Sequence, residues 1–154
     1  MKTLVLENKQ VVPVFNTLDA IKVAEGRVMR GKGKLQKKLV ELEKEYQEDR
    51  QEILEVYFEV DEKGELKRDK QGKLITLEGK DEQDGLEKIQ ELLDEEVKID
   101  VVTFDTKLKV LYEALDKDDF TTAKDKEINE MGFDTLMDVL EEVFENYKKE
   151  EEKA

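Results

Sequence analysis

The sequence predicts an α+β fold that is mainly helical, in which a long charged helix packs on shorter helices beside a small sheet of two to four strands. Apolar residues recur at helical spacing over most of the chain, and short β-prone runs lie between them. Of the 154 residues, 44% are charged and 38% are hydrophobic. This composition favours extended helices around a thin core. The length predicts one domain over residues 1–149, followed by a frayed acidic tail at 150–154.

The first elements are expected to be a short strand and a helix. Residues 3–6 are β-prone, and Asn8 is a suitable N-cap for a helix over about residues 9–24. Pro13 lies just beyond the first turn of that helix, so the regular helix could begin at Pro13 instead. Gly26 is expected to separate this helix from the next.

The clearest pattern is a heptad seam with alternating spacings of four and three residues. Its members are Leu35, Leu39, Leu42, Tyr46, Asp49, Ile53, Val56 and Val60. The seam predicts one long helix over about residues 35–60, or with an earlier start at Arg27. We favour packing of this seam within the chain, as in a helical hairpin or bundle. A coiled-coil homo-oligomer through Leu35–Val60 is the alternative.

Two related hexads follow, at residues 61–66 and 69–74, and both read D-x-x-G-x-L. Gly64 and Gly72 are expected in turns, and β-prone residues 74–77 follow the second turn. The pattern predicts a small hairpin or a meandering turn. A calcium loop of the EF-hand type would need alternating oxygen ligands and a glutamate at its last position, which both hexads lack.

A helix and the best strand of the chain are predicted next. Asp81 or Asp84 can cap the helix, which extends to about residue 95. Its apolar face is predicted to contain Leu86, Ile89 and Leu93. The strand covers residues 97–104, and we expect it to pair with the N-terminal strand and with the β-prone run after Gly72.

The C-terminal part is expected to be helical. Asp105 or Thr106 can cap a helix whose apolar residues follow at helical spacing. A short helix is predicted near residues 122–131, with Gly132 at its end. The last helix is predicted over about residues 134–149.

Composition excludes several classes of function. The chain has neither cysteine nor histidine, so disulfides, thiolate nucleophiles, zinc sites of the Cys/His type and Ser–His triads are ruled out. The acidic run at residues 116–119 could hold magnesium, but we favour a hydrated surface loop. No pattern predicts a catalytic residue, metal site or cofactor. We therefore expect a protein that is not an enzyme, and keep a carboxylate-bound metal hydrolase only as a distant alternative.

One segment stands apart from the acidic rest of the chain. Residues 26–38 read GRVMRGKGKLQKK and contain six basic residues and no acidic one, whereas the whole chain holds 41 acidic and 27 basic residues, with a net charge of −14. The candidate basic patch comprises Arg27, Arg30, Lys32, Lys34, Lys37 and Lys38. The segment departs from the phosphate-loop motif, because its last glycine is followed by Lys34 and Leu35. It also lacks the aromatic residues of a single-strand binder.

Two interpretations of this patch stay open. Its cations could neutralise an acidic face of the same chain, with Glu141, Glu142 and Glu145 as candidates, or they could contact an acidic partner. Basic residues near the start of a helix are disfavoured by the helix dipole, so an acidic contact outside this helix, on this chain or on a partner, is the better explanation. The net charge disfavours direct binding to nucleic acid or to an anionic membrane.

Residues 6–15, which read LENKQVVPVF, carry a family resemblance. This stretch resembles the start of a family of small uncharacterised proteins from tailed phages and prophages of Gram-positive bacteria. The likeness continues through the basic segment, residues 35–46, the turns at Gly64 and Gly72, and residues 95–100, which together cover the N-terminal two-thirds of the chain. It implies a phage origin, with the bacterial host cytoplasm or the virion as the setting.

Together these observations lead to two functional expectations. The first is a non-catalytic phage accessory protein that binds another protein, such as a phage structural protein during virion assembly. The second is an acidic anti-defence inhibitor that imitates nucleic acid and occupies a basic site on a host defence enzyme.

Overall fold

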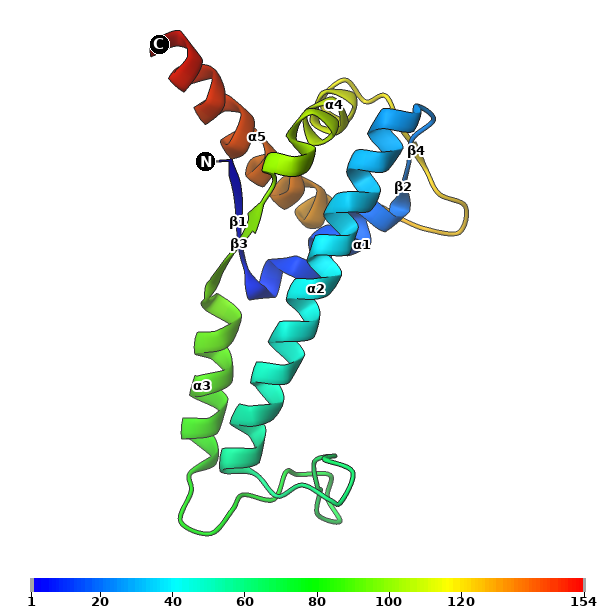
Figure 1. The fold of residues 1–154 in the computed structure, drawn as a ribbon. Helices are drawn as coiled ribbons and strands as arrows, with labels where there is room; N and C mark the ends of the chain where they lie inside the picture. Colours follow the sequence, from blue (N-terminus) through cyan, green and yellow to red (C-terminus); the bar gives the residue numbers. More distant parts are fainter. Residues whose placement is uncertain (1, 154) are drawn as a thin grey trace. The chain divides into compact units, whose positions relative to one another are not determined.

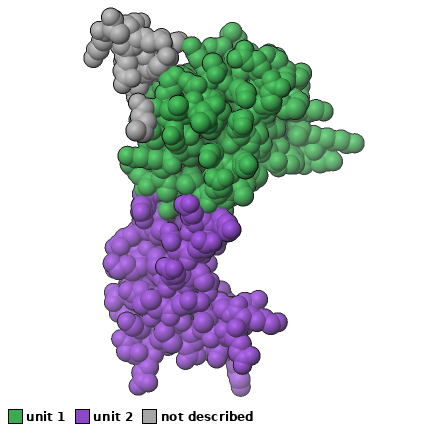
Figure 2. Space-filling view, in the orientation of Figure 1, with its two compact units in different colours: residues 1–43, 96–154 green, residues 44–95 purple. Residues whose placement is uncertain are grey.

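The computed structural model describes the backbone of residues 2–153 and the side chains of residues 2–145. The chain forms two compact units, one of residues 1–43 and 96–154 and the other of residues 44–95 (Figure 2). We call them unit 1 and unit 2. Cooperative unfolding of residues 1–149 as one domain stays a prediction. The predicted tail at residues 150–154 lies outside the part whose side chains are described.

Within residues 2–153 the fold is α+β and mainly helical, with five α-helices and two antiparallel sheets of two strands each (Figure 1). This confirms the predicted fold class. In the first sheet, β1 (Thr3–Glu7) pairs with β3 (Glu96–Asp100). Side chains alternate between the two faces of a strand, and Leu4 and Leu6 are accordingly buried. The predicted pairing of these strands is confirmed, although a 3₁₀ turn replaces the last residues of the second strand.

Helix α1 (Asn8–Ala20) follows β1 directly. Its N-cap is Glu7 rather than the predicted Asn8, and the Glu7 N–H donates to Gln10 Oε1 at 2.9 Å. Pro13 lies inside the helix, so the alternative start at this residue is wrong. Thr17 Oγ1 donates to the Pro13 carbonyl oxygen at 2.8 Å, as Thr side chains within helices commonly do.

The predicted long helix is α2 (Gly26–Tyr57), which starts near the earlier of the two predicted positions. Its seam has two different environments. Leu35 and Leu39 are fully buried in the core of unit 1, as expected for packing within the chain. In unit 2, the seam residues Asp49 and Val56 are exposed.

The two predicted glycine turns are confirmed in unit 2. Gly64 and Gly72 have φ of +80° and +81°, values that glycine adopts without steric cost. The segments flanking these turns form a closed ring of hydrogen bonds. The Lys67 N–H donates to Glu59 O at 3.0 Å, the Ile75 N–H to Lys67 O at 3.3 Å, and the Glu59 N–H to Ile75 O at 2.8 Å.

This ring corrects one predicted strand pairing. Residues 74–77 were expected to join the sheet of the N-terminal strand. They instead form antiparallel bridges within unit 2, Arg68 with Leu74 and Phe58 with Thr76. The eight-residue spacing of the ring members explains this choice, because each turn returns the chain beside the preceding segment.

Helix α3 (Glu82–Asp94) begins as predicted at Asp81, whose side chain accepts a hydrogen bond from the Gln83 N–H at 2.9 Å. Its inward face is partly different from the prediction. Gly85 and Leu92 are buried, whereas Leu86 is 46% exposed. A Cβ at position 85 would lie 2.9 Å from the Phe58 ring. Because glycine has no side chain, α3 can pack against Phe58 with its Gly85 side facing inward.

Helix α4 (Asp105–Asp116) carries the predicted apolar face, with Leu108, Leu111 and Leu115 buried. The predicted short helix near residues 122–131 is wrong. The chain forms β4 (Thr121–Thr122) there, which pairs with β2 (Ile21–Lys22) in the second sheet. Two-residue strands carry too few residues to show an alternating pattern, so the sequence did not indicate them.

The last helix, α5 (Glu130–Lys153), begins earlier than predicted. Gly132 lies inside its first turn, where its N–H donates to Asn129 Oδ1 at 3.0 Å. Asn129 therefore acts as the N-cap, and the prediction that Gly132 ends a helix is wrong. The glycine is needed for a close helix contact, since a Cβ there would lie 2.4 Å from Thr17 Oγ1.

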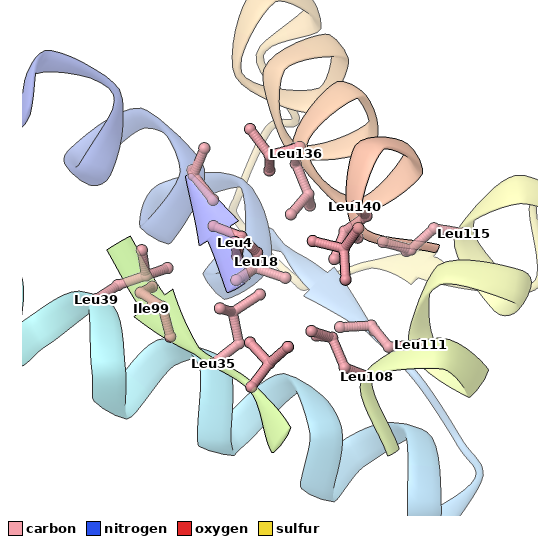
Figure 3. Packing of buried hydrophobic residues seen from close by; sticks show 14 of the residues in the cluster. Leu4, Leu18, Leu35, Leu39, Ile99, Leu108, Leu111, Leu115, Leu136 and Leu140 are labelled. Atoms are coloured by element: carbon pink, nitrogen blue, oxygen red, sulfur yellow. The ribbon is translucent and has the colours of Figure 1, made fainter. Parts of the chain in front are cut away.

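The apolar core of unit 1 lies where four helices meet the β1–β3 sheet. Figure 3 shows leucines of α1, α2, α4 and α5 converging beside Leu4 of β1 and Ile99 of β3. The burial follows the helical and strand periodicities of the sequence, so most of this core could be predicted. It fixes the first half of α2, whose outer side carries the basic segment.

Candidate protein-binding face

The first half of α2 has a buried and an exposed side. Val28, Leu35 and Leu39 turn into the core of unit 1 and are at most 3% exposed. Because α-helical side chains repeat every 3.6 residues, the residues on the opposite side of the helix point away from the core. Five of the six basic residues of the segment, all except Lys32, are exposed.

Gly31 explains how closely α2 approaches α4. A Cβ at this position would lie 2.4 Å from the Lys107 carbonyl oxygen, a distance too short for any side chain. Gly31 is thus a packing residue. The other glycine of the segment, Gly33, has no atom within 4 Å of its Cβ position, so unit 1 does not require it.

Lys32 is the member of the predicted patch that turns inward. Its Nζ donates to the Ile21 carbonyl oxygen at 2.5 Å. Burial lowers the pKa of Lys32, and the carboxylate of Asp19 opposes this shift. Lys32 therefore supports the connection between α1 and α2 and is not part of the outward surface.

Four of the predicted basic residues point outward: Arg27, Arg30, Lys34 and Lys37 are all exposed. None of them forms an ion pair with any side chain that the structure describes. Lys38 differs, because its Nζ lies 3.8 Å from Glu41 Oε2, one turn along the same helix.

Apolar residues lie among these cations. Met29 and Val40 are 53% and 54% exposed. Spacings of four and seven residues place Met29, Gly33 and Val40 along one line of the helix surface. The sequence analysis did not identify this line because its members lie outside the heptad seam. Their helical spacing from the seam residues would have placed them together on the exposed side of α2. We use the term cationic face for Arg27, Met29, Arg30, Gly33, Lys34, Lys37 and Val40.

Among the described side chains, no ion pair joins the predicted acidic residues to the cationic face. Glu141, Glu142 and Glu145 are exposed on α5, and within the described side chains none of them forms an ion pair with the basic segment. Glu141 and Glu145 instead lie close enough to Tyr112 to act on it. Burial raises the pKa of the Tyr112 phenol, and the negative charges of Glu141, Asp116 and Glu145 raise it further.

A family model described as "Protein of unknown function (DUF1617)" matches residues 2–152. The chain belongs to this family. Comparison with curated proteins and with solved structures found no match. The match extends through α4 and α5, beyond the part of the chain on which the sequence resemblance rested.

Other candidate sites have less support. Among the described residues there is no group of three or more acidic side chains placed to hold a metal ion. Asp118 and Asp119 lie in an exposed turn after α4, where their N–H groups donate to the Leu115 and Ala114 carbonyl oxygens. No helix in residues 2–153 combines the length and the apolarity that crossing a membrane requires.

Proposed function

We propose that this protein is a non-catalytic accessory protein that binds another protein through its cationic face. The observation that carries the proposal is the set of four exposed cations, Arg27, Arg30, Lys34 and Lys37, that lack ion-pair partners among the described side chains. An acidic chain gains most by pairing such cations internally, because pairing would relieve its self-repulsion. Cations left free on a rigid helix are available to a partner.

The apolar line strengthens this proposal. Protein interfaces combine apolar contact at their centre with a polar rim, and arginine and methionine are enriched in them. Met29 and Val40 supply apolar contact, and Arg30, Lys34 and Lys37 supply one charged border. Gly33 lets a partner approach the helix backbone closely, while a glycine inside a helix costs about 1 kcal/mol relative to alanine. The partner is therefore expected to carry carboxylates around an apolar strip.

The setting we propose is a bacteriophage. The resemblance of residues 6–15 and of the following segments to proteins of tailed phages and prophages supports it. We propose that the partner is a phage structural protein and that binding contributes to virion assembly, in the bacterial host cytoplasm or within the virion itself.

A capture experiment tests the proposal. Tagged protein is recovered from infected cells, bound proteins are identified by mass spectrometry, and the captured protein is purified and titrated against the wild type. The triple variant R30E/K34E/K37E should lose binding and keep the wild-type melting temperature. The control K98E/K117E/K124E changes the same charge at exposed residues elsewhere in unit 1 and should bind normally. Retained binding by the first variant would contradict the proposal.

A second candidate function rests on the acidic surface. The net charge of −14 and the exposed Glu141, Glu142 and Glu145 favour an inhibitor that imitates nucleic acid on a basic site of a host defence enzyme. Such binding rests almost entirely on charge, so its affinity should fall steeply with salt. Binding through the cationic face includes apolar contact and should fall less steeply. The variant E141K/E142K/E145K should lose only the inhibitor activity.

A further inference from the structure

We propose that the cationic face of one copy docks into a groove on unit 2 of a second copy, so that copies associate head to tail. The inference rests on the proposed function, because it names a partner for the same face. It is carried by a groove whose charge and apolar floor complement that face.

The groove lies between the second half of α2 and α3, which run antiparallel in unit 2 (Figure 1). Its volume is about 480 Å³, and Ile53 of α2 and Leu92 of α3 form its apolar floor. Glu91 and Glu95 line its α3 side. One cation, Lys88, also lies there and pairs with Glu91, with Nζ 3.3 Å from Oε2. We call this feature the acidic groove.

The heptad seam of α2 reaches the groove at Ile53. Tyr46, Asp49 and Ile53 follow one another at spacings of three and four residues, so they share one stripe of α2. Tyr46 and Ile53 are half-buried, and Asp49 is exposed. The seam is thus buried within the chain only in unit 1. In unit 2 the seam keeps exposed surface that a second helix would cover, as in the coiled-coil alternative.

Unit 2 also has too little core for its size. Only three of its hydrophobic residues are buried, Leu54, Phe58 and Leu92, whereas the core cluster of unit 1 contains 22 buried residues. A unit of this length buries little surface by itself and gains stability when another helix covers it. A helix in the acidic groove would supply that cover.

The charge of unit 2 determines which helix of a second copy can bind in the acidic groove. Unit 2 contains 18 acidic and nine basic residues, so two copies of unit 2 would repel each other. The first half of α2 is the helix of this chain that carries opposite charge. Its line of Met29, Gly33 and Val40 would cover Tyr46 and Ile53, and its cations would meet Asp49, Glu91 and Glu95. The fit follows the helix-in-groove mode of recognition.

Head-to-tail contacts use two different surfaces on each copy, so they are heterologous. Each bound copy leaves one face and one groove free, and assembly grows until a ring closes or a filament forms. The purified wild type should therefore increase in average mass as its concentration rises from the low micromolar to the several hundred micromolar range. The increase should shrink with added salt because several contacts are between charges.

Mixing two neutralised variants tests the direction of the contact by sedimentation velocity. R30Q/K34Q/K37Q lacks a functional face and D49N/E91Q/E95Q lacks a functional groove, so each should be monomeric alone. Together they keep one intact face and one intact groove, and should form a 1:1 dimer and nothing larger. The control E62K/E78K/E87K changes exposed acidic residues of unit 2 outside the groove and should associate as the wild type does.

A combined charge reversal tests complementarity. R30E/K34E/K37E and D49K/E91K/E95K should each abolish association, and the six changes together should restore it, with circular dichroism confirming folding throughout. A monomeric wild type at all concentrations, or a mixture of neutralised variants that stays monomeric, would overturn the inference. If the wild type is monomeric while a captured phage protein still requires Arg30, Lys34 and Lys37, self-association fails and the proposed function stands.

Discussion

Gly31 of α2 packs against the backbone of Lys107 so closely that a Cβ would lie 2.4 Å from the Lys107 carbonyl oxygen. This contact sets how near α2 and α4 approach, and it holds the cationic face on a fixed support. Two glycines that look equivalent in the sequence, Gly31 and Gly33, therefore have opposite roles.

Substitution by alanine should separate these two glycines. G31A should lower the free energy of unfolding by about 1–3 kcal/mol, because backbone atoms must move to admit the methyl group. G33A should raise it by about 1 kcal/mol, because alanine favours the helix and its Cβ meets no atom within 4 Å. Urea unfolding monitored by circular dichroism measures both changes. Equal effects of the two substitutions would contradict the packing described for Gly31.

The contact of Gly132 with α1 should also be sensitive to a methyl group. A Cβ there would lie 2.4 Å from Thr17 Oγ1 and 3.0 Å from the Pro13 carbonyl oxygen, so G132A should destabilise unit 1 by about 1–3 kcal/mol. Removing the hydroxyl first should reduce that cost. A double-mutant cycle with T17A and G132A measures the coupling, and additive effects would exclude a direct contact.

The Lys2–Asp105 ion pair should contribute a pH-dependent part of the stability. The hydrogen bond from Lys2 lowers the pKa of Asp105 below its ordinary value of 3.8. A carboxylate whose pKa is depressed by folding stabilises the folded state above the unfolded pKa, and loses this contribution as the pH falls below 3.8 through the folded pKa. D105N should therefore be less stable than the wild type at neutral pH.

The difference in stability between D105N and the wild type should shrink as the pH falls below the pKa that the Asp105 carboxyl group has in the unfolded state. Urea midpoints of both proteins between neutral and strongly acidic pH provide the measurement. D138N, a change at an exposed residue of α5, is the matched control. A difference between D105N and the wild type that is constant with pH would show that Asp105 acts by packing alone.

The pKa of Tyr112 should be sensitive to the acidic residues around it. Its ring stacks on Phe144 with centroids 5.7 Å apart, and burial together with Glu141, Asp116 and Glu145 raises its pKa above 10.0. Folding thus favours the neutral phenol, and this contribution to stability is lost as the pH rises from 10.0 through the folded pKa. The ultraviolet titration of the wild type minus that of Y112F isolates the group.

Removing nearby charge should lower the pKa of Tyr112. E141Q/E145Q should shift the difference titration to lower pH, because two like charges that disfavour the phenolate are gone. E127Q/E130Q, at exposed residues elsewhere in unit 1, should leave it unchanged. An unchanged Tyr112 titration in E141Q/E145Q would mean that these two glutamates do not contribute to the shift, which would then come from burial and Asp116.

Repeating patterns made most of the fold predictable from the sequence. The heptad spacing indicated α2, and apolar spacing indicated the buried faces of α4 and α5, because helical periodicity decides which side chains meet the core. The turns at Gly64 and Gly72 followed from their D-x-x-G chemistry. These features depend on residues that are close together along the chain, so the local sequence is sufficient to predict them.

Features that depend on distant neighbours could not be predicted. The β2–β4 pairing joins Ile21 to Thr122 through strands too short for a pattern. Gly132 resembles a helix end in the sequence, but it fits under Thr17 of another helix. The candidate site shows the same division, because the cations of the basic segment were evident, while the inward turn of Lys32 depends on the Ile21 carbonyl oxygen.

The hydrogen-bonded ring of Glu59, Lys67 and Ile75 has a consequence for self-assembly. Each of these residues gives its N–H to one neighbour and receives the N–H of the other, so none of the three segments presents an open strand edge at this level. An open edge would recruit any extended chain and compete with ordered contacts. Because the ring is closed, these three residues cannot pair with an added strand. Association of unit 2 then depends on its side chains, whose identity can select one partner.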